Sequence, residues 1–265
     1  MIVVPTIVAV AGLVTTAVVI LGILGVPTKF GPLVAVLRAA VQLGLLGLVL
    51  QGLITDLRWI ALALTGMNAV AIGAAGRRIQ VRGIREWLAV AAAVPAGALT
   101  AGTIVFATGA LEADPTYILA FGGIVTGNAM SITSLAGRGF LDRVGDGWDE
   151  VEAWLALGAR KPYAVRRFLR LAAARALMPS VDQARTTGLV TLPGAFIGAV
   201  FGGASPLEAA RFQLIVSSGI MAAGAVSTLI LLAIMSRVAV RPAPSQEAPV
   251  QPGPRPQEAP QVAHR

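Results

Sequence analysis

The chain has 265 residues, of which 56% are hydrophobic and only 13% are charged, and its mean hydropathy is +0.78. Soluble globular proteins carry about 25% charged residues, so this composition excludes an ordinary soluble domain and indicates an integral membrane protein. Because the chain has no cysteine and a single histidine, His264, it cannot form disulfides, cysteine nucleophiles or metal cages of His and Cys. The net charge of +8 is attributed to cytoplasmic loops, where Lys and Arg gather in membrane proteins, and nucleic acid is not expected as a partner.

Seven apolar stretches approach the length of about 20 residues that an α-helix needs to cross a bilayer. They do not alternate with polar residues as barrel strands do, and lipid offers no partners for backbone groups, so the sequence predicts an all-α polytopic protein. The seven predicted spans are residues 2–25, 33–54, 59–76, 87–110, 116–136, 187–205 and 212–235. The first lacks a basic start and is longer than the core of a signal peptide, so we interpret it as a retained span.

The charge distribution predicts an N-terminus outside and a C-terminus in the cytoplasm of the cell membrane. In this orientation only Arg58 and Arg211 of the basic residues outside the spans face the exterior. The two external loops after the fourth and sixth spans instead carry Glu112, Asp114 and Glu208. The odd number of spans agrees with this topology.

Polar side chains inside spans are costly in lipid, so they are candidates for a substrate path. Arg38 and Gln42 are four residues apart in the second span and share a face. Arg38 is also close enough to the cytoplasmic end to reach the interface, which is the alternative interpretation. Asn68 is the candidate in the third span.

In the fifth span the candidate for the path is Asn128, with Thr126 and Ser131 nearby. Gly123 and Gly127 lie four residues apart in the same stretch, a spacing of small residues that allows helices to pack closely. Packing, with Asn128 as an interhelical hydrogen-bonding group, is therefore the favoured interpretation of this stretch.

Residues 137–186 form a predicted cytoplasmic segment between the fifth and sixth spans. A first short helix is expected from Trp148 to Leu157, capped by Asp146 and stopped by Gly158. One side of this helix carries an apolar stripe of Trp148, Val151 and Leu155. A helix this short is not stable alone, so the stripe should dock onto another surface.

A second helix is expected to begin at Pro162 and to end before Pro179. Arg166 and Arg170 share a face of it, with Arg167 and Arg175 close by. By residue pattern alone, this basic helix could lie on anionic lipid headgroups or act as a solvated connector.

The sixth span contains Pro193 between Gly188 and Gly194, and these three residues predict a hinge or kink. Asp182 precedes the span; a helix cap or a salt bridge with Arg185 is commoner for such a residue than a metal contact. No Asp or Glu lies inside any of the seven predicted spans.

From residue 239 onward the sequence is rich in Pro, Gln, Glu and Ala. We expect residues 1–238 to form the transmembrane domain and residues 239–265 to form a disordered cytoplasmic tail. A Pro-x-x-Pro ligand in this tail is conceivable, but a solvated tail is the commoner outcome.

Several motifs carry a family resemblance. The segments "LRAAVQLGLLGLVL" (37–50), "MNA" (67–69), "GGIVTGNAM" (122–130), "LALGARKP" (155–162), "RALMPSVDQARTTGLVTLPG" (175–194) and "SPLEAARFQLIV" (205–216) resemble bacterial iron-export ABC permeases and the similar plant aluminium-tolerance subunits. The segment 152–159 also resembles the "EAA-x-x-LGA" signature that ABC membrane subunits present to their ATPase, with Trp154 in place of the second Ala. This chain departs from the importer pattern in one respect. In importers a Leu-Pro pair follows the signature glycine after fewer residues than separate Gly158 from Leu177-Met178-Pro179 in this chain.

The resemblance implies a permease that works as a homodimer with two separate ATPase subunits. The implied ATPase-coupling residues are Glu152, Ala153, Trp154, Leu157, Gly158 and Ala159, and the apolar stripe would enter a groove on the ATPase. The chain contains no Gly-Lys pair and hence no P-loop, so ATP and Mg would be bound by the partner and no cofactor is expected here.

The resemblance also implies export of iron or another metal ion. Without cysteine or internal histidine, iron would depend on carboxylates, amides and the sulfur of Met67 or Met130, which select iron weakly. The chain is thus expected to be no enzyme itself and to have no identifiable metal ligands. The alternatives are a chelate, a nucleotide sugar or a lipid-like substrate, or an ATP-independent secondary transporter or channel.

Overall fold

A computed structural model describes residues 3–26, 30–53 and 57–237, and nearly all of these residues are helical. The helices are α1 (Val3–Ile23), α2 (Gly31–Leu53), α3 (Leu57–Ile79), α4 (Ile84–Ala107), α5 (Pro115–Asp146), α6 (Trp148–Ala156), α7 (Lys161–Ala164), α8 (Arg166–Thr186), α9 (Gly194–Phe201) and α10 (Pro206–Met235). Within the described ranges the only β pairing is an isolated bridge between Thr187 and Thr191. The predicted all-α class is confirmed, whereas the predicted tail, residues 239–265, lies outside the described residues.

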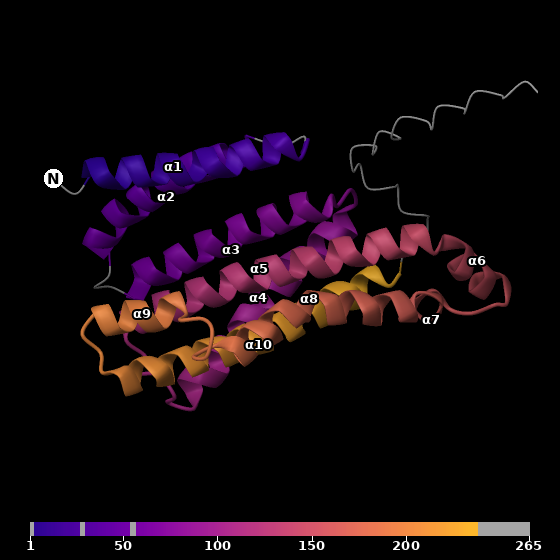
Figure 1. The fold of residues 1–265 in the computed structure, drawn as a ribbon. Helices are drawn as coiled ribbons and strands as arrows, with labels where there is room; N and C mark the ends of the chain where they lie inside the picture. Colours follow the sequence, from indigo (N-terminus) through magenta and orange to yellow (C-terminus); the bar gives the residue numbers. More distant parts are fainter. Residues whose placement is uncertain (1–2, 27–29, 54–56, 238–265) are drawn as a thin grey trace, which may run out of the picture. The chain divides into compact units, whose positions relative to one another are not determined.

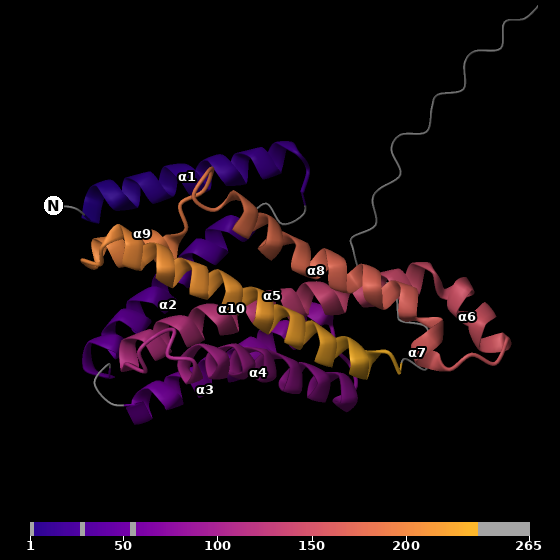
Figure 2. The same ribbon diagram turned by 90° about the horizontal axis from the view of Figure 1, so that it is seen from below.

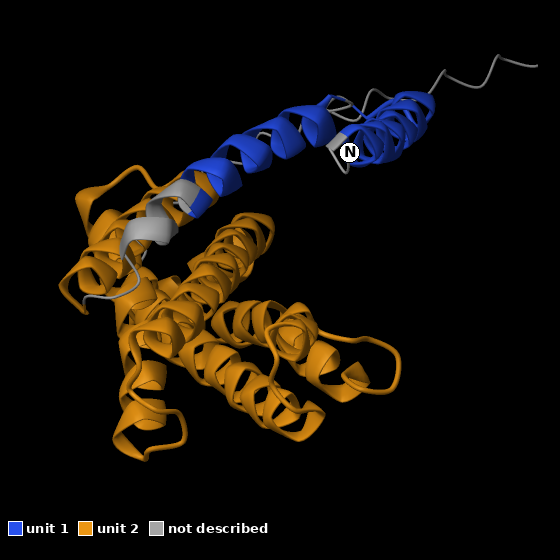
Figure 3. Ribbon diagram, turned by 90° about the vertical axis from the view of Figure 1, so that its left-hand side faces the viewer, with its two compact units in different colours: residues 1–48, 245–265 blue, residues 49–244 orange. Residues whose placement is uncertain are grey.

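The chain divides into two compact units (Figure 3). One unit comprises residues 1–48 and 245–265, and its described part holds α1 and most of α2. The other unit comprises residues 49–244 and holds α3 to α10. In the first unit, α1 is apolar along its whole length and exposes most of its side chains, as expected of a helix that meets lipid.

Five helices of the described residues are long and apolar enough to cross a membrane: α1, α3, α4, α5 and α10. They correspond to the predicted first, third, fourth, fifth and seventh spans, and the 23-residue helix α2 overlaps the predicted second span. The predicted sixth span, 187–205, is wrong as a continuous helix. It begins with a turn, and its helix α9 has eight residues, which is only about 12 Å of helix.

The helix α8, and not the predicted sixth span, connects the α6 end of the second unit to the α9 end (Figures 1 and 2). Figures 1 and 2 show α6 and α7 at one end of the second unit and α9 at the other, with α8 between them. The buried face of α8 consists of Phe168, Ala172 and Ala176, and α8 packs on α5 and α10. The sequence placed the whole segment 137–186 beyond the spans, but α8 runs alongside them.

The interior of the second unit is built from α3, α4, α5, α8 and α10. Phe121 and Phe140 on α5 are fully buried, and Phe121 meets Phe106 of α4 edge to face with ring centroids 5.9 Å apart. A close helix crossing joins α4 to α10, where a Cβ on Gly97 would overlap Ser227 Oγ and the carbonyl oxygen of Ala223. Small residues therefore set the spacing of this bundle, as is usual in membranes.

Two helices that begin opposite the α6 end have defined caps. The carboxylate of Asp114 accepts a hydrogen bond from the Thr116 backbone N–H at 2.8 Å and starts α5. Ser205 and Glu208 form a capping box at the start of α10. The α6 end carries Arg77 and Arg78 in the last turn of α3. The orientation in the membrane stays a prediction.

Candidate functional site

The first candidate site is the hairpin that follows α5. With 32 residues, α5 is about 48 Å long, compared with a hydrocarbon thickness of about 30 Å, so it is long enough for one end to extend beyond the bilayer. The helix α6 begins directly after it, at the predicted Trp148. Its N-cap is Gly147 with no side-chain cap, so the cap predicted for Asp146 is wrong. A Cβ on Gly147 would lie 2.5 Å from the Phe168 ring, which explains the glycine at this tight corner.

The apolar stripe of α6 faces the chain's own core. Val151 is only 2% exposed, and Trp148 and Leu155 are half-buried against the core cluster. The expectation that this stripe enters a groove on an ATPase is therefore wrong, because its surface is already covered by neighbouring helices. The stripe instead fixes the hairpin to the bundle.

The opposite face of the hairpin carries the motif residues. Exposed positions are Glu152, Ala153, Trp154, Leu157 and Gly158, and Ala159 is half-exposed. Leu157 is 80% exposed, Trp154 39% and Tyr163 54%, and the rings of Trp154 and Tyr163 meet edge to face with centroids 5.3 Å apart. These three side chains form an exposed apolar cluster, called here the hairpin knob.

The turn of the knob has a defined backbone geometry. Gly158 has a φ of +84°, and the N–H groups of Gly158 and Ala159 donate to the carbonyls of Leu155 and Trp154, each at 3.0 Å. This pattern is a Schellman motif, and it confirms the predicted stop at Gly158. The positive φ favours glycine here.

The hairpin is also joined to α8 by charge. Arg167 Nη1 donates to Glu150 Oε2 at 2.8 Å across the corner between α6 and α8. Both side chains are accessible to water, so this pair contributes little to stability. Pro162 lies in the first turn of the short helix α7, and the second helix begins separately at Arg166 and continues through Pro179 to Thr186, so the end predicted before Pro179 is wrong.

The path candidates Asn68 and Thr126 meet between α3 and α5. Asn68 Nδ2 donates to the Leu64 carbonyl at 3.0 Å and to Thr126 Oγ1 at 3.4 Å. Its Oδ1 is buried without a hydrogen-bond partner among the described residues. The contact is one that joins two helices, and a role of Asn68 in a path stays a prediction.

The other candidates on α5 are separate from this pair. Asn128 Nδ2 donates to the Ile124 carbonyl of its own helix at 2.8 Å, and Met130 packs half-buried against the core. A Cβ on Gly123 would approach Met67 of α3 at 3.1 Å, whereas Gly127 has open space. The predicted pair of packing glycines is therefore right only for Gly123.

Arg38 and Gln42 lie on α2 in the first unit, and both are exposed. They do share a helix, as predicted, but they belong to a different unit from Asn68, Asn128 and Met130. Their role in a path stays a prediction.

The three predicted hinge residues do not interrupt a helix. Gly188, with a φ of +82°, lies in the turn after α8, Pro193 is the N-cap of α9, and Gly194 is its first residue. The helices with an internal proline are instead α4, at Pro95, and α8, at Pro179. A mid-helix kink at Pro193 is therefore wrong, because the preceding turn has already ended the helix.

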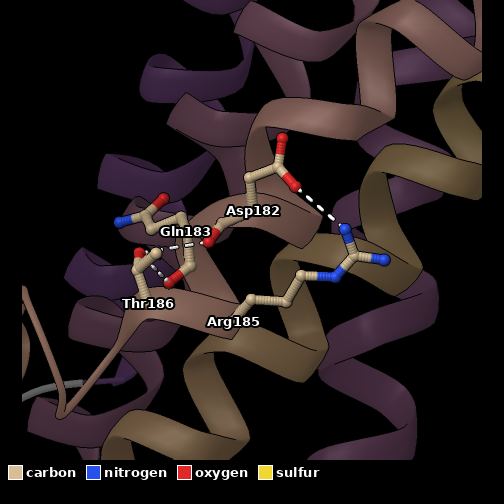
Figure 4. A network of polar contacts seen from close by, with 4 residues as sticks. All are labelled: Asp182, Gln183, Arg185 and Thr186. Carbon is tan, nitrogen blue, oxygen red and sulfur yellow. Dashed lines mark hydrogen bonds and ion pairs between the residues drawn. The ribbon is translucent and has the colours of Figure 1, made fainter.

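The C-terminal turns of α8 hold a small polar network (Figure 4). Arg185 Nη1 donates to Asp182 Oδ1 at 3.1 Å, as the sequence suggested, and Thr186 Oγ1 donates to the carbonyls of Asp182 and Gln183. The apolar stretches of the sequence did not identify α8 as part of the bundle, because its charged residues lower its hydropathy. Residues that could hold a metal ion, in groups of three or more His, Cys, Asp or Glu, are absent from the described part of the chain.

Comparison with known proteins agrees with this architecture. The model of the uncharacterised protein family UPF0014 matches residues 4–239. The chain is 37% identical over 200 residues to the "UPF0014 membrane protein STAR2" of Oryza sativa, covering 75% of this chain and 70% of the rice protein. It is 32% identical over 208 residues to "Protein ALUMINUM SENSITIVE 3" of Arabidopsis thaliana, covering 74% and 72%.

A bacterial relative is the "Probable iron export permease protein FetB" of Escherichia coli, 31% identical over 138 residues, which cover 52% of this chain and 53% of that one. No solved structure matches the chain. Since the family model covers nearly the whole chain and the helices have membrane-spanning length, this multi-pass membrane protein belongs to the UPF0014 family.

Proposed function

We propose that this chain is the membrane-spanning permease subunit of an ABC exporter, acting as a homodimer with two separate ATPase subunits at its cytoplasmic face. ATP and Mg belong to the partner, and ATP hydrolysis there drives the helices between inward-open and outward-open states. The exported substrate class proposed from the name of the Escherichia coli relative is iron or another metal ion. A non-metal substrate, such as a nucleotide sugar, is the alternative.

The hairpin knob is the observation that carries this proposal. Its inner side is anchored by Val151 in the core, while Trp154, Leu157 and Tyr163 are exposed beyond the end of α5. Exposed aromatic and aliphatic side chains at one corner are typical of a protein-binding surface. A rigidly held apolar knob suits a partner that must push on the bundle.

The test is co-purification of the neighbouring ATPase subunit with the full-length chain. Leu157→Glu places a charge on the knob without touching the core, since Leu157 is 80% exposed. Leu207→Glu is the matched control, because Leu207 is 81% exposed and lies at the opposite end of the second unit, in the first turn of α10. We expect ATPase binding to fall at least about tenfold for Leu157→Glu, which corresponds to losing one hot-spot contact, and to stay unchanged for Leu207→Glu.

Thermal unfolding of each variant separates loss of binding from loss of folding. Wild-type chain that never retains an ATPase subunit, in the presence of ATP or without it, contradicts the proposal. Glu152→Lys offers a second variant at the exposed face. Gly158→Arg is less informative, because the φ of +84° would be strained by any side chain.

An ATP-independent secondary transporter is the second candidate, and one observation favours it. Asp182 lies on α8 beside the spans, so an acidic residue is closer to the bundle than the sequence indicated. Flux in vesicles that contain the chain alone, driven by an ion gradient, would support this candidate. Flux that requires both the ATPase subunit and ATP would support the ABC exporter.

A further inference from the structure

The polar face of α8 is not explained by the hairpin knob. Arg175, Asp182 and Thr186 are all exposed, and they share one side of the helix because their spacings of seven and eleven residues are about two and three turns. Met178 lies between Arg175 and Asp182 on this side and is 47% exposed. Gln183 and Arg185 flank it. These six residues are called here the α8 polar face.

Contacts with two spans fix the depth of this face. A Cβ on Gly224 of α10 would lie 2.5 Å from Ile132 of α5 and 3.3 Å from Leu177 of α8, so these three residues lie at one level. By the helical rise, Ile132 is about 25 Å from the start of α5, and Gly224 is about 27 Å from the start of α10. The two helices have 32 and 30 residues, hence lengths of about 48 and 45 Å.

A hydrocarbon layer of about 30 Å therefore includes this level wherever it is placed along α5 and α10. Arg175 lies about 3 Å from Leu177 along α8 towards the hairpin, and Asp182 lies about 7 Å from it in the other direction. Arg175 and Asp182 stand at about the two limits of the stretch that every such placement includes. Met178, between them, is thus inside the hydrocarbon layer, whereas Arg185 and Thr186 lie nearer to its edge on the side away from the hairpin.

Lipid is an unfavourable neighbour for this face. An arginine or aspartate at the centre of a bilayer costs about 2.5–3.5 kcal/mol even on permissive scales, and such residues face a bundle interior or a water-filled cavity. Within the described residues, Arg175 has neither an ion-pair nor a hydrogen-bond partner, and the pair of Asp182 and Arg185 remains largely exposed. Water in a route within this chain or between the two copies of the proposed dimer would satisfy all of these groups.

The charges of the face are unequal. Arg185 and Asp182 neutralise each other at 3.1 Å, which leaves the positive charge of Arg175 without a counter-charge. A bare divalent cation would be repelled by this surplus, and no carboxylate cluster is present in the described residues to hold it. A guanidinium group suits planar carboxylates and phosphates, which it can bind through two parallel hydrogen bonds.

We propose that the α8 polar face lines a water-filled route through the membrane and that this route takes an anionic solute with a carboxylate or phosphate group. The inference rests on the transport function proposed above and narrows its substrate class. A metal ion would travel this route as an anionic complex and not as a bare cation.

The absence of cysteine makes the face directly testable in the full-length chain. Met178→Cys places a thiol between Arg175 and Asp182 without changing a charge. The variant is placed in phosphatidylcholine vesicles and treated on both sides with an anionic or a cationic water-soluble methanethiosulfonate reagent. Leu99→Cys and Leu229→Cys are the controls, since both side chains are exposed apolar positions on spans α4 and α10.

We expect Met178→Cys to react and the two controls to stay unmodified, because a thiolate forms only in contact with water. The rate of each reagent is divided by its rate with a free thiol in solution. The normalised rate of the anionic reagent should exceed that of the cationic one about five- to tenfold, because the charge of Arg175, about 7 Å away in water, attracts one reagent and repels the other. Arg175→Gln should abolish this gain, and Arg175→Lys should preserve it. Tryptophan fluorescence and thermal unfolding check that each variant is folded.

Two results would overturn the proposal. A Met178→Cys thiol as unreactive as the controls would place lipid or a tightly packed second copy against the face. Equal normalised rates of the anionic and the cationic reagent with Met178→Cys would show that the face contacts water but does not favour anions, which contradicts the proposed substrate class. The measurement uses neither ATP nor the ATPase, so its failure is distinct from loss of ATPase binding by the hairpin knob, which alone bears on the exporter proposal.

Discussion

The crossing of α4 and α10 at Gly97 offers the sharpest test of the fold. Gly97→Ala adds one methyl group, and its Cβ would overlap Ser227 Oγ and the Ala223 carbonyl oxygen, with the carbonyl carbon of Ala223 at 3.2 Å. Two of these atoms are backbone atoms of α10, so a rotamer change cannot relieve the contact. The helices must separate or the local backbone must shift.

The expected magnitude follows from two opposed terms. Overpacking a filled interior by a methylene-sized group costs about 1–3 kcal/mol. Replacing glycine by alanine within a helix contributes about 1 kcal/mol in the opposite direction. Gly102→Ala on the same helix receives only the second term, because its Cβ would meet no atom within 4 Å. The two variants should therefore differ in unfolding free energy by about 1–3 kcal/mol, with Gly97→Ala the less stable.

Thermal unfolding in one detergent, followed by the fluorescence of the four tryptophans, measures this difference. A difference of this size corresponds to a shift in Tm of about 2–4 °C per kcal/mol for a chain of this length class. Gly97→Val should lower Tm further than Gly97→Ala does, because its side chain is larger. Equal Tm values for Gly97→Ala and Gly102→Ala would show that α4 and α10 do not cross as closely as described.

Three further outcomes are expected. Val151→Asp should prevent stable folding of the hairpin, because a buried carboxylate without a partner costs several kcal/mol. Trp154→Ser should lower the free energy of unfolding by no more than about 1.5 kcal/mol, the contribution of its ring pair with Tyr163, and should weaken ATPase binding; unfolding and co-purification measure the two effects. Asn68→Leu should change stability by no more than about 0.6 kcal/mol, since the lost hydrogen bond to Thr126 is offset by removal of a buried oxygen without a partner. Gly158→Ala should cost about 1–2 kcal/mol, because its φ is +84°, and hydrogen exchange should locate the loosening at the end of α6.

Much of the fold could be predicted because apolar length is a strong signal in membranes. Uninterrupted runs of apolar residues predicted α1, α3, α4, α5 and α10. In lipid each spanning segment must form its own backbone hydrogen bonds, so such a run indicates a helix. The stop at Gly158 was also readable, because a glycine after an apolar stripe is a local signal that needs no tertiary context.

The path of α8 could not be predicted from hydropathy. Its charges, from Arg166 to Arg185, exclude it from any apolar window, although its small residues Ala172 and Ala176 allow it to pack on α5 and α10. The apolar stretch 187–205 attracted the prediction of a span instead. Only contacts between distant segments distinguish a polar helix inside a bundle from one outside it.

The direction of the α6 stripe was missed for a related reason. Helical periodicity identifies which residues share a side but not which neighbour covers that side. Trp148, Val151 and Leu155 were correctly grouped, and their partner is the chain's own core. The residues left exposed, Trp154 and Leu157, were already present in the motif.

The hairpin knob and the α8 polar face are connected through one hydrophobic core cluster. Val151 of α6 and Val165 and Phe168 around the start of α8 are buried in the same core cluster as Val144 of α5. A force on Leu157 would thus be passed to α5 and α8 together, because close-packed interiors transmit strain. On the proposed function, closure of the ATPase would shift Arg175 directly, whereas Asp182 lies beyond Pro179, where the missing backbone hydrogen bond lets α8 bend. On this proposal the face would widen or narrow at Pro179, and a hinge in the turn at Gly188, Pro193 and Gly194 stays a prediction.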